Sequence, residues 1–429
     1  MLQVVPTADI HAFLKAHTAE AALDPQIVQR AREICDDVCE RGDTAVVEYT
    51  HRYDNADVSA SLRVPEDRID EAVERCDREF LAVMRRLASR LRLFHERQKL
   101  TSWEAHHEGV RFGERVRPIP SVACYAPFGT SPYPSTVLMT CLPATVADVP
   151  RIVLSSPPAV YGSVAADFLV AAHLCGVREI YQMGGAQAIA ALAFGTESVR
   201  RVDKLVGPGN AYVNAAKQYV RAYVGLDSLA GPSDATIVAD GSADPAGLAA
   251  ELLAQAEHDE YASAFLIVTD ERVLVAVLGE VERQIAELPR REIARTALRR
   301  SAAFLCASVD ETLPILNQLA PEHLLLWIDE PDAYLDRVES YGAAFLGHNT
   351  SVVFGDYGGT SNHTLPTLRT ARYSSGLRTT EFQVSAAFVE LSATAVDRVA
   401  PDVEVMAARE QLAGHAAAAR MRRERLRTL

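Results

Sequence analysis

The side chains best placed to bind a metal ion lie in the segment DPAGLAAELLAQAEHD, which begins at Asp244. An aspartate that can cap a helix, followed by a proline that suits the first turn, predicts that this segment is helical. On that helix Gln255 shares one apolar stripe with Leu248 and Leu252, and His258 follows three residues later. The two polar side chains then project from the same side, as paired metal ligands would. A hydrogen-bonded buried pair also fits, and spacing alone favours it.

Two further polar clusters lie nearer the C-terminus. The glycine-rich stretch GDYGGTSNHTLPT carries Asp356, Asn362 and His363, and a flexible loop can present oxygen and nitrogen ligands to a metal. A solvated turn would contain the same residues. In AREQLAGHAAAARMR, Glu410 and His415 stand five residues apart on a predicted helix or its bend. By itself, a histidine on an exposed alanine-rich helix indicates no chemistry.

A carboxylate and an imidazole adjoin in LAPEHLLLWI, where Glu322 and His323 open an apolar strand. Burial at this point would bring both groups toward a neutral pKa. Adjacent residues of a strand face opposite ways, so both can serve one site only if Pro321 holds them in the preceding loop, outside the regular pleat. The alternative is a strand-opening turn with a solvated carboxylate.

The elements that position these residues change in character along the chain. Residues 25–105 are charge-rich with helical spacing. From about residue 120, short apolar runs alternate with alanine-rich helical stretches, which is typical of parallel α/β layers. These runs are RIVLSS, REIYQM, DKLVG, DATIVAD, SAFLIVTD and AAFLG. We therefore predict a mainly helical region over 1–119, α/β domains over 120–236 and 237–380, joined near AGPSD (Ala230 to Asp234), and a helical segment over 381–429.

A ligand site is expected between the two α/β blocks, because clefts between domains are common binding sites. Two glycine-containing loops also follow predicted strands, where parallel sheets usually meet their ligands. MGGAQ follows REIYQ, and GPGN, Gly207 to Asn210, follows DKLV. Each loop is equally a tight strand-to-helix turn. GPGNAY lacks the third glycine of GxGxxG, so spacing alone does not predict NAD.

The composition excludes several classes of partner. A formal charge of −14, from 57 acidic and 43 basic side chains, would repel nucleic acid and anionic lipid. The N-terminus lacks the pattern of a secretion signal, and no apolar run is long enough for a membrane span. The 7 cysteines include no CxxC pair and are predicted to be reduced core residues of a cytoplasmic protein.

In this order along the chain, the segments resemble the histidinol dehydrogenase family. The resemblance covers about 300 residues, and an ordered set of motifs is far more specific than any one of them. The matching segments are YAPFGTSPYPSTVLM, GGAQAIAALAFGTES, DKLVGPGN, AGPSD, QAEH, APEH, GDY, NHTLPT and E-x4-H. It implies an α/β fold of two incomplete Rossmann-like parallel domains with helical N- and C-terminal extensions.

The resemblance also implies the activity: oxidation of L-histidinol to L-histidine, through histidinal, with zinc and two NAD. The implied zinc ligands are Gln255, His258, Asp356 and His415, with His415 supplied by the partner subunit of a homodimer. The implied catalytic pair is Glu322 and His323. Ser233, His363 and Glu410 would line the substrate site with His323 and the zinc ligands, and Tyr125, Gln187 and Asn210 would contact NAD.

These residue types suit the implied chemistry. An alcohol that loses a hydride must also lose a proton, and imidazole titrates near working pH, so His323 is the candidate base. The aldehyde must then be hydrated, and the carboxylate of Glu322 can activate the water. Zinc would hold the substrate's amine and imidazole.

Two stretches depart from the family pattern. Phe128 and Gly129 replace two consecutive glycines, and phenylalanine resists positive φ and adds bulk near the expected nucleotide. The stretch 348–354 lacks the usual acidic, proline-containing version before Asp356. An alternative is therefore a family member that oxidises another small polyol or a sulfonated diol, but Glu410 would repel a sulfonate. A catalytically silent scaffold is disfavoured because Glu322 and His323 are both present.

Overall fold

A computed structural model describes residues 2–19, 24–128, 133–159, 163–228 and 231–428. The chain forms two compact units. The large unit comprises residues 1–98 and 119–382, and the small unit comprises residues 99–118 and 383–429. Gly129 and Ala230 lie outside the described residues.

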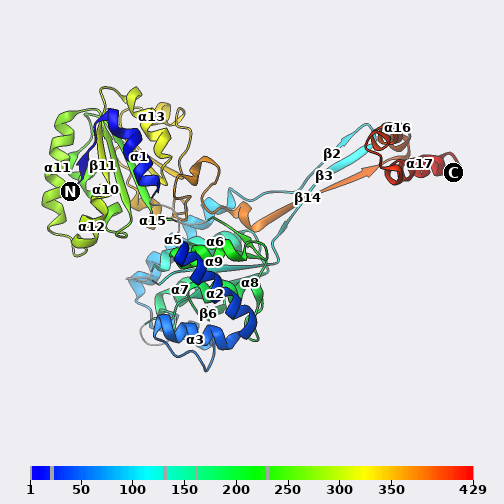
Figure 1. The fold of residues 1–429 in the computed structure, drawn as a ribbon, viewed down its shortest axis with the longest axis horizontal. Helices are drawn as coiled ribbons and strands as arrows, with labels where there is room; N and C mark the ends of the chain where they lie inside the picture. The colour runs from blue at the N-terminus through cyan, green and yellow to red at the C-terminus, as the bar shows by residue number, and fades with distance from the viewer. Residues whose placement is uncertain (1, 20–23, 129–132, 160–162, 229–230, 429) are drawn as a thin grey trace. The chain divides into compact units, whose positions relative to one another are not determined.

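The large unit contains two parallel sheets (Figure 1). The five-stranded sheet has the order β6-β5-β4-β7-β8, and the six-stranded sheet has the order β1-β11-β10-β9-β12-β13. In the five-stranded sheet the chain starts in the middle with β4, adds two strands on one side, then crosses to add two on the other. In the six-stranded sheet β9 to β13 follow the same order, and β1 is an additional strand at one edge. This order reversal is that of a Rossmann fold lacking its last strand, so the predicted fold class is confirmed. The predicted domain boundaries remain a prediction.

The strands coincide with the apolar runs of the sequence. The first sheet consists of β4 (Ser121–Tyr125), β5 (Arg151–Ser156), β6 (Glu179–Gln182), β7 (Lys204–Val206) and β8 (Gly225–Leu226). The second consists of β1 (Gln3–Val4), β9 (Asp234–Ala239), β10 (Ser263–Val268), β11 (Ala302–Leu305), β12 (His323–Trp327) and β13 (Ala343–Leu346). Both faces of β4 are buried: Val122 and Cys124 join one core cluster, and Ala123 and Tyr125 join the other. A strand covered on both sides needs apolar residues at every position, which is why these runs do not alternate.

Helices cover both faces of each sheet. The cores of the first sheet contain residues of α2 (Pro25–Arg41), α3 (Asp43–Asp54), α8 (Gly185–Phe194) and α9 (Ala211–Val220) on one face and α4 (Glu66–Arg75), α5 (Arg78–Glu96), α6 (Pro134–Val146) and α7 (Ala166–Leu174) on the other. Those of the second contain α10 (Pro245–Ala256), α11 (Glu271–Ile285) and α12 (Arg291–Leu298), opposite α1 (Ile10–Ala19), α13 (Val309–Leu319) and α14 (Pro331–Leu335). The short helix α15 (Val353–Gly358) follows β13, and three 3-10 turns are η1 (Thr7–Asp9), η2 (Thr370–Arg372) and η3 (Thr379–Phe382). The helical spacing predicted after residue 25 is confirmed by α2, which buries Ala31, Ile34 and Val38.

No helix within the described ranges is long and apolar enough to cross a membrane.

The cysteines are unpaired thiols. Five of the seven are buried, as predicted. The prediction is wrong for Cys39, which is exposed near the end of α2, and for Cys76, which is half-buried. A small apolar residue on the outer face of an amphipathic helix is not distinguished from a core residue by its type alone.

The small unit is an antiparallel sheet of order β14-β3-β2 with two helices. Its elements are β2 (Trp103–His107), β3 (Val110–Pro118), β14 (Gln383–Leu391), α16 (Ala393–Arg409) and α17 (Ala413–Thr428). Arg111 forms ion pairs with Glu104 at 3.1 Å and with Glu390 at 2.9 Å, across all three strands. These mostly exposed strands were not predicted, because little of their surface is buried and so their apolar pattern is weak.

Candidate active site

Helix α10 presents Gln255 as the sequence predicts. The Asp244 carboxylate accepts a hydrogen bond from the Gly247 N–H and caps the helix, and Gln255 is buried beside the apolar stripe. His258 does not share the helix with Gln255, because α10 ends at Ala256. It lies in the turn that follows, where its N–H donates to the Gln255 carbonyl at 3.4 Å. The two side chains therefore come from a helix end rather than from a continuous helical face.

A relay of hydrogen bonds orients the Gln255 amide. Its Nε2 donates to the Ser233 Oγ at 3.0 Å. The Ser233 side chain is in turn hydrogen-bonded to the Glu322 carboxylate, and this contact opposes the rise in the pKa of Glu322. With its nitrogen used in this way, the amide offers its oxygen to a metal ion, and such outer contacts commonly fix the orientation of a ligand.

Glu322 and His323 are held by one residue that is not among those predicted, Asp234. The Asp234 N–H donates to Glu322 Oε2 at 3.1 Å, and the Glu322 N–H donates back to Asp234 Oδ2 at 3.1 Å. His323 Nδ1 lies 3.1 Å from the Asp234 carbonyl oxygen. Because a carbonyl can only accept, Nδ1 carries the proton in the neutral ring and Nε2 has the free lone pair. Within the described residues, Nε2 is buried and has no hydrogen-bond partner.

The predicted condition that both residues lie outside the pleat is wrong for His323. Glu322 lies in the bend before the strand, but His323 is the first residue of β12, in register with Ala235 of β9. Their side chains approach nonetheless: His323 Nδ1 is 3.7 Å from Glu322 Oε2. A strand end allows this because the residue before it is free of the regular alternation.

Two carboxyl groups meet at this strand end. Burial raises the pKa of Glu322 to about 8, against hydrogen bonds from Ser233 and Asp234. Burial, followed by the charge of Glu322, raises the pKa of Asp234 to about 7. Like charges so close in a buried place disfavour ionisation of both carboxyls at once. For Glu322, the direction of this shift is the one expected from the sequence.

Asp356 faces the histidines from α15. It is buried, and its charge raises the pKa of His258 and of His363 against burial, the larger effect, which lowers both. The pKa of His363 falls to about 4. Zinc binds imidazole in its neutral form and carboxylate in its ionised form, so this arrangement suits a zinc ion. Among the described residues, no three His, Cys, Asp or Glu side chains form a metal-binding group, so any site here needs the Gln255 amide and a further ligand.

The unusual stretch 348–354 is anchored to the same helix. The Val352 N–H donates to the Glu251 carboxylate at 3.2 Å, and Glu251 lies on α10 one turn before Gln255. Asp356 belongs to the short helix α15 and not to a glycine-rich loop as predicted, since the glycines that end this turn begin at Gly358. The departure from the family pattern therefore leaves a defined support for Asp356.

Glu410 and His415 belong to the small unit. Glu410 directly follows α16 as its C-cap, and His415 lies in α17 after a turn in which Gln411 has a φ of 60°. Both residues are exposed. The predicted helix or bend is therefore a bend between two helices.

The three residues expected to contact NAD lie at the carboxyl ends of the first sheet. Tyr125 is the last residue of β4, and its hydroxyl accepts from the Gly185 N–H at 3.1 Å. Gln187 is buried in the first turn of α8, after β6. The Asn210 side chain caps α9 by accepting from the N–H groups of Tyr212 and Val213.

Buried contacts with Tyr125, Lys217 and Asp227 hold the GPGN loop in place. Gly207 has a φ of 113°, and a Cβ there would lie 2.1 Å from the Tyr125 carbonyl oxygen. The fully buried Lys217 donates to the Gly207 carbonyl at 2.5 Å and forms an ion pair with Asp227 at 2.8 Å. Asp227 in turn accepts from the Gly207 N–H at 2.7 Å. The strands β4 and β7 are neighbours at the point where the strand order reverses, which is the usual nucleotide crevice.

Phe128 is accommodated without strain. It is not among the positive-φ residues of the described chain, and its ring packs edge-on against Phe168 at 6.2 Å.

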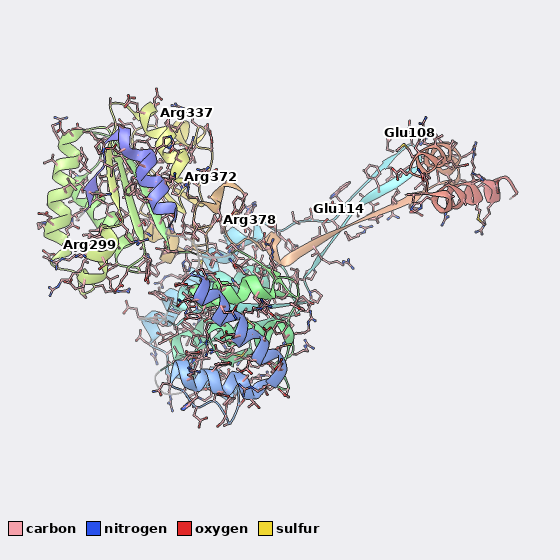
Figure 2. All side chains as sticks on the ribbon, in the orientation of Figure 1. Glu108, Glu114, Arg299, Arg337, Arg372 and Arg378 are labelled. Atoms are coloured by element: carbon pink, nitrogen blue, oxygen red, sulfur yellow. The ribbon has the colours of Figure 1, made fainter. Side chains whose placement is uncertain are left out.

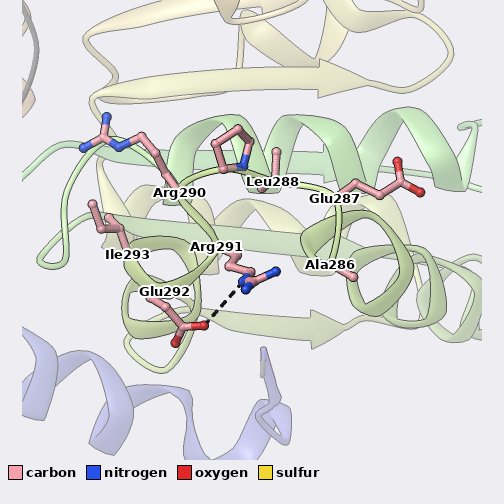
Figure 3. A pocket seen from close by; sticks show the side chains of 8 residues that line it. Ala286, Glu287, Leu288, Arg290, Arg291, Glu292 and Ile293 are labelled. Atoms are coloured by element: carbon pink, nitrogen blue, oxygen red, sulfur yellow. Dashed lines mark ion pairs between the residues drawn. The ribbon is translucent and has the colours of Figure 1, made fainter.

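A surface cavity of about 610 Å³ lies elsewhere (Figure 3). It is lined by residues 286–293, between α11 and α12, where Arg291 lies 3.8 Å from Glu292. None of the predicted site residues lines it. Arginines such as Arg299 and Arg337 lie at the surface of the large unit (Figure 2).

Comparisons with known proteins identify relatives over more than nine-tenths of the chain. The family model for histidinol dehydrogenase matches residues 17–423. The histidinol dehydrogenase of Geobacillus kaustophilus is 44% identical over 395 residues, covering 92% of this chain and 93% of that protein. That of Geobacter sulfurreducens is 44% identical over 394 residues, covering 91% and 92%. A crystal structure of histidinol dehydrogenase from Elizabethkingia anophelis matches with a TM-score of 0.93 and 34% identity, covering 99% of both chains.

Proposed function

The chain belongs to the histidinol dehydrogenase family of oxidoreductase enzymes, and we propose that it oxidises L-histidinol to L-histidine, through histidinal, with two molecules of NAD. The observation that carries this proposal is the pair at the start of β12. His323 has a fixed proton on Nδ1 and an unpaired Nε2, and Glu322 lies 3.7 Å away. One base and one carboxylate are what two successive oxidations at the same carbon require.

His323 is the proton acceptor of the first oxidation. Its Nε2 takes the hydroxyl proton of the alcohol, and the Asp234 carbonyl stabilises the resulting imidazolium through Nδ1. The ring also stacks on Phe345 at 6.2 Å, which limits its rotation.

Glu322 serves the second oxidation. The aldehyde is hydrated by a water molecule that the ionised carboxylate deprotonates. The reciprocal hydrogen bonds with Asp234 hold the carboxylate in place, and the raised pKa of Glu322 makes it a stronger base than an exposed glutamate. The two residues therefore divide the two steps.

The donor set fits zinc. Gln255, His258 and Asp356 offer an amide oxygen, a neutral imidazole and a carboxylate, and His415 from a second copy of the chain would complete four ligands. When bound, zinc supplies a Lewis acid that holds the substrate's amine and imidazole, and NAD supplies the hydride acceptor. Ser233, His363 and Glu410 position the substrate, and Tyr125, Gln187 and Asn210 bind NAD.

We propose a homodimer with shared sites, and the membership of His415 in the small unit, apart from the other proposed ligands, supports this proposal. The test is to mix inactive variants. Refolding His258→Ala protein with His415→Ala protein gives heterodimers in which one site holds both histidines, so activity recovers to about a quarter of the wild-type value for random pairing. If the mixture stays inactive although subunits have exchanged, each chain uses its own His415 and the shared site is excluded.

The function is tested by counting NADH. Purified zinc-loaded protein is offered L-histidinol and, separately, small polyols and sulfonated diols. We expect two NADH for each histidinol consumed, with histidine as the product, and no turnover of the sulfonated diols, whose charge Glu410 repels. Turnover of a diol in preference to histidinol would instead support the alternative substrate.

A further inference from the structure

We infer that His95 is a positioning residue, which holds the loop carrying His363 through a hydrogen bond to Asn362. The inference rests on the proposed function, because His363 is taken to contact the substrate. His95 lies on α5 and is completely buried, and its Nε2 lies 3.1 Å from the Asn362 Nδ2.

The proton positions in this contact follow from its neighbours. Gln98 Oε1 accepts from the Thr379 N–H at 3.1 Å and lies 3.0 Å from His95 Nδ1. An amide oxygen has no proton to give, so Nδ1 is the donor and Nε2 of the neutral ring accepts. Burial lowers the pKa of His95 to about 4, which keeps the ring neutral. The Thr379 hydroxyl donates to the His95 carbonyl at 2.7 Å and ties the same residues together again.

The orientation of the Asn362 amide is equally fixed. Its Oδ1 accepts from the Thr364 N–H at 2.8 Å, so Nδ2 points the other way. There Nδ2 donates to the Met139 carbonyl at 2.7 Å and to His95. Asn362 therefore uses both hydrogens of its amide nitrogen and its oxygen, and cannot turn over without breaking three hydrogen bonds.

Two further residues of this loop, Gly359 and His363, contact α5 and α6. Gly359 has a φ of 70°, and a Cβ there would lie 2.7 Å from the Leu87 carbonyl of α5. His363 is hydrogen-bonded to the backbone of Ser135, one turn before Met139 on α6. Its position is thus set by Asn362 on one side and by α6 on the other. Because the His363 ring is near Asp356, His258 and His323, a displaced loop would misplace it in the candidate site.

Two substitutions of His95 by amide side chains distinguish the hydrogen bond to Asn362 from a general effect on packing. His95→Gln can extend its amide oxygen to the place of Nε2 and still accept from Asn362. His95→Asn is one carbon shorter and can keep only the hydrogen bond to Gln98. The exposed His51→Asn is the control.

We expect His95→Asn to raise the KM for histidinol about tenfold, as the loss of one buried hydrogen bond does, with the KM for NAD unchanged. His95→Gln should restore the KM to within about threefold of wild type. Hydrogen–deuterium exchange of residues 359–367 should rise in the Asn variant and not in the Gln variant. This readout requires no substrate, so it still tests the contact if the wild-type protein fails to oxidise histidinol, which would refute the proposed function alone. Equal exchange in both variants, or equal changes in both KM values, would overturn the inference.

Discussion

The two sheets of the large unit share one order over five strands, apart from the extra edge strand β1, but place their candidate residues at opposite ends of the strands. In the first sheet, Tyr125 and Gly207 lie at the carboxyl ends of the neighbouring strands β4 and β7. In the second, Asp234 and His323 are the first residues of the equivalent strands β9 and β12. The strand order reverses at both pairs. Equivalent positions in two similar folds are therefore used in different ways.

The difference lies in what each end of a parallel sheet offers. At the carboxyl ends, helices begin, and their free N–H groups and dipoles suit the phosphates of a nucleotide. Gly185, with a φ of 64°, begins α8 there, and its own N–H donates to the Tyr125 hydroxyl. At the amino ends of β9 and β12 the candidate groups are side chains. The carboxylates of Glu322 and Asp234 each accept a hydrogen bond from the other residue's backbone N–H. Under the proposed function, backbone groups at the carboxyl ends would contact the nucleotide, and side chains at the amino ends would carry out the proton transfers.

The largest effect is expected at the proposed zinc ligands. His258→Ala and Asp356→Ala should abolish stoichiometric zinc binding, measured by elemental analysis of folded protein, because each removes one of four ligands. His348→Ala, which removes an exposed histidine on the stretch leading to Asp356, should leave the zinc content unchanged. Full zinc retention in the two ligand variants would show that the metal site is wrongly assigned.

The nucleotide side is tested at Gly207. A Cβ in Gly207→Ala would press on the Tyr125 carbonyl and strain the backbone, so the loop should move and the KM for NAD should rise about tenfold or more. Zinc content should stay normal, because Gln255 lies on α10, Asp356 on α15 and His258 just after α10, and the substitution changes none of these. Gly279→Ala is the control, since nothing lies within 4 Å of its added carbon. An unchanged KM for NAD would place the cofactor elsewhere.

A smaller effect is expected from pH. The pKa of Glu322 is raised from 4.5 to about 8, so the carboxyl is protonated and inactive as a base at lower pH. Histidinal oxidation should therefore increase with pH and level off above about pH 8. The rising limb should disappear in Glu322→Gln. The same limb in both proteins would assign it to another group, such as Asp234.

Much of the fold could be predicted from the sequence, because buried parallel strands need continuous apolar runs and these are bounded by glycines and helices. The sequence did not predict the position of residues that depends on contacts between distant parts of the chain. Asp234 looks like one residue of a turn, and only the alignment of β9 with β12 places it beside Glu322. Likewise, His258 was predicted to lie on the helix, but α10 ends at Ala256, before it. The strands β2, β3 and β14 bury too little surface to leave a clear pattern.

The division of the reaction between His323 and Glu322 is the central claim, and it is tested by measuring the two oxidations separately. Histidinol and histidinal are each supplied to His323→Asn and Glu322→Gln protein, and NADH formation is followed in single turnovers. Loss of a general base costs about a hundredfold or more in rate. We expect His323→Asn to block histidinol oxidation, and Glu322→Gln to leave that step nearly intact while slowing histidinal oxidation. Equal impairment of both steps in both variants would contradict the account.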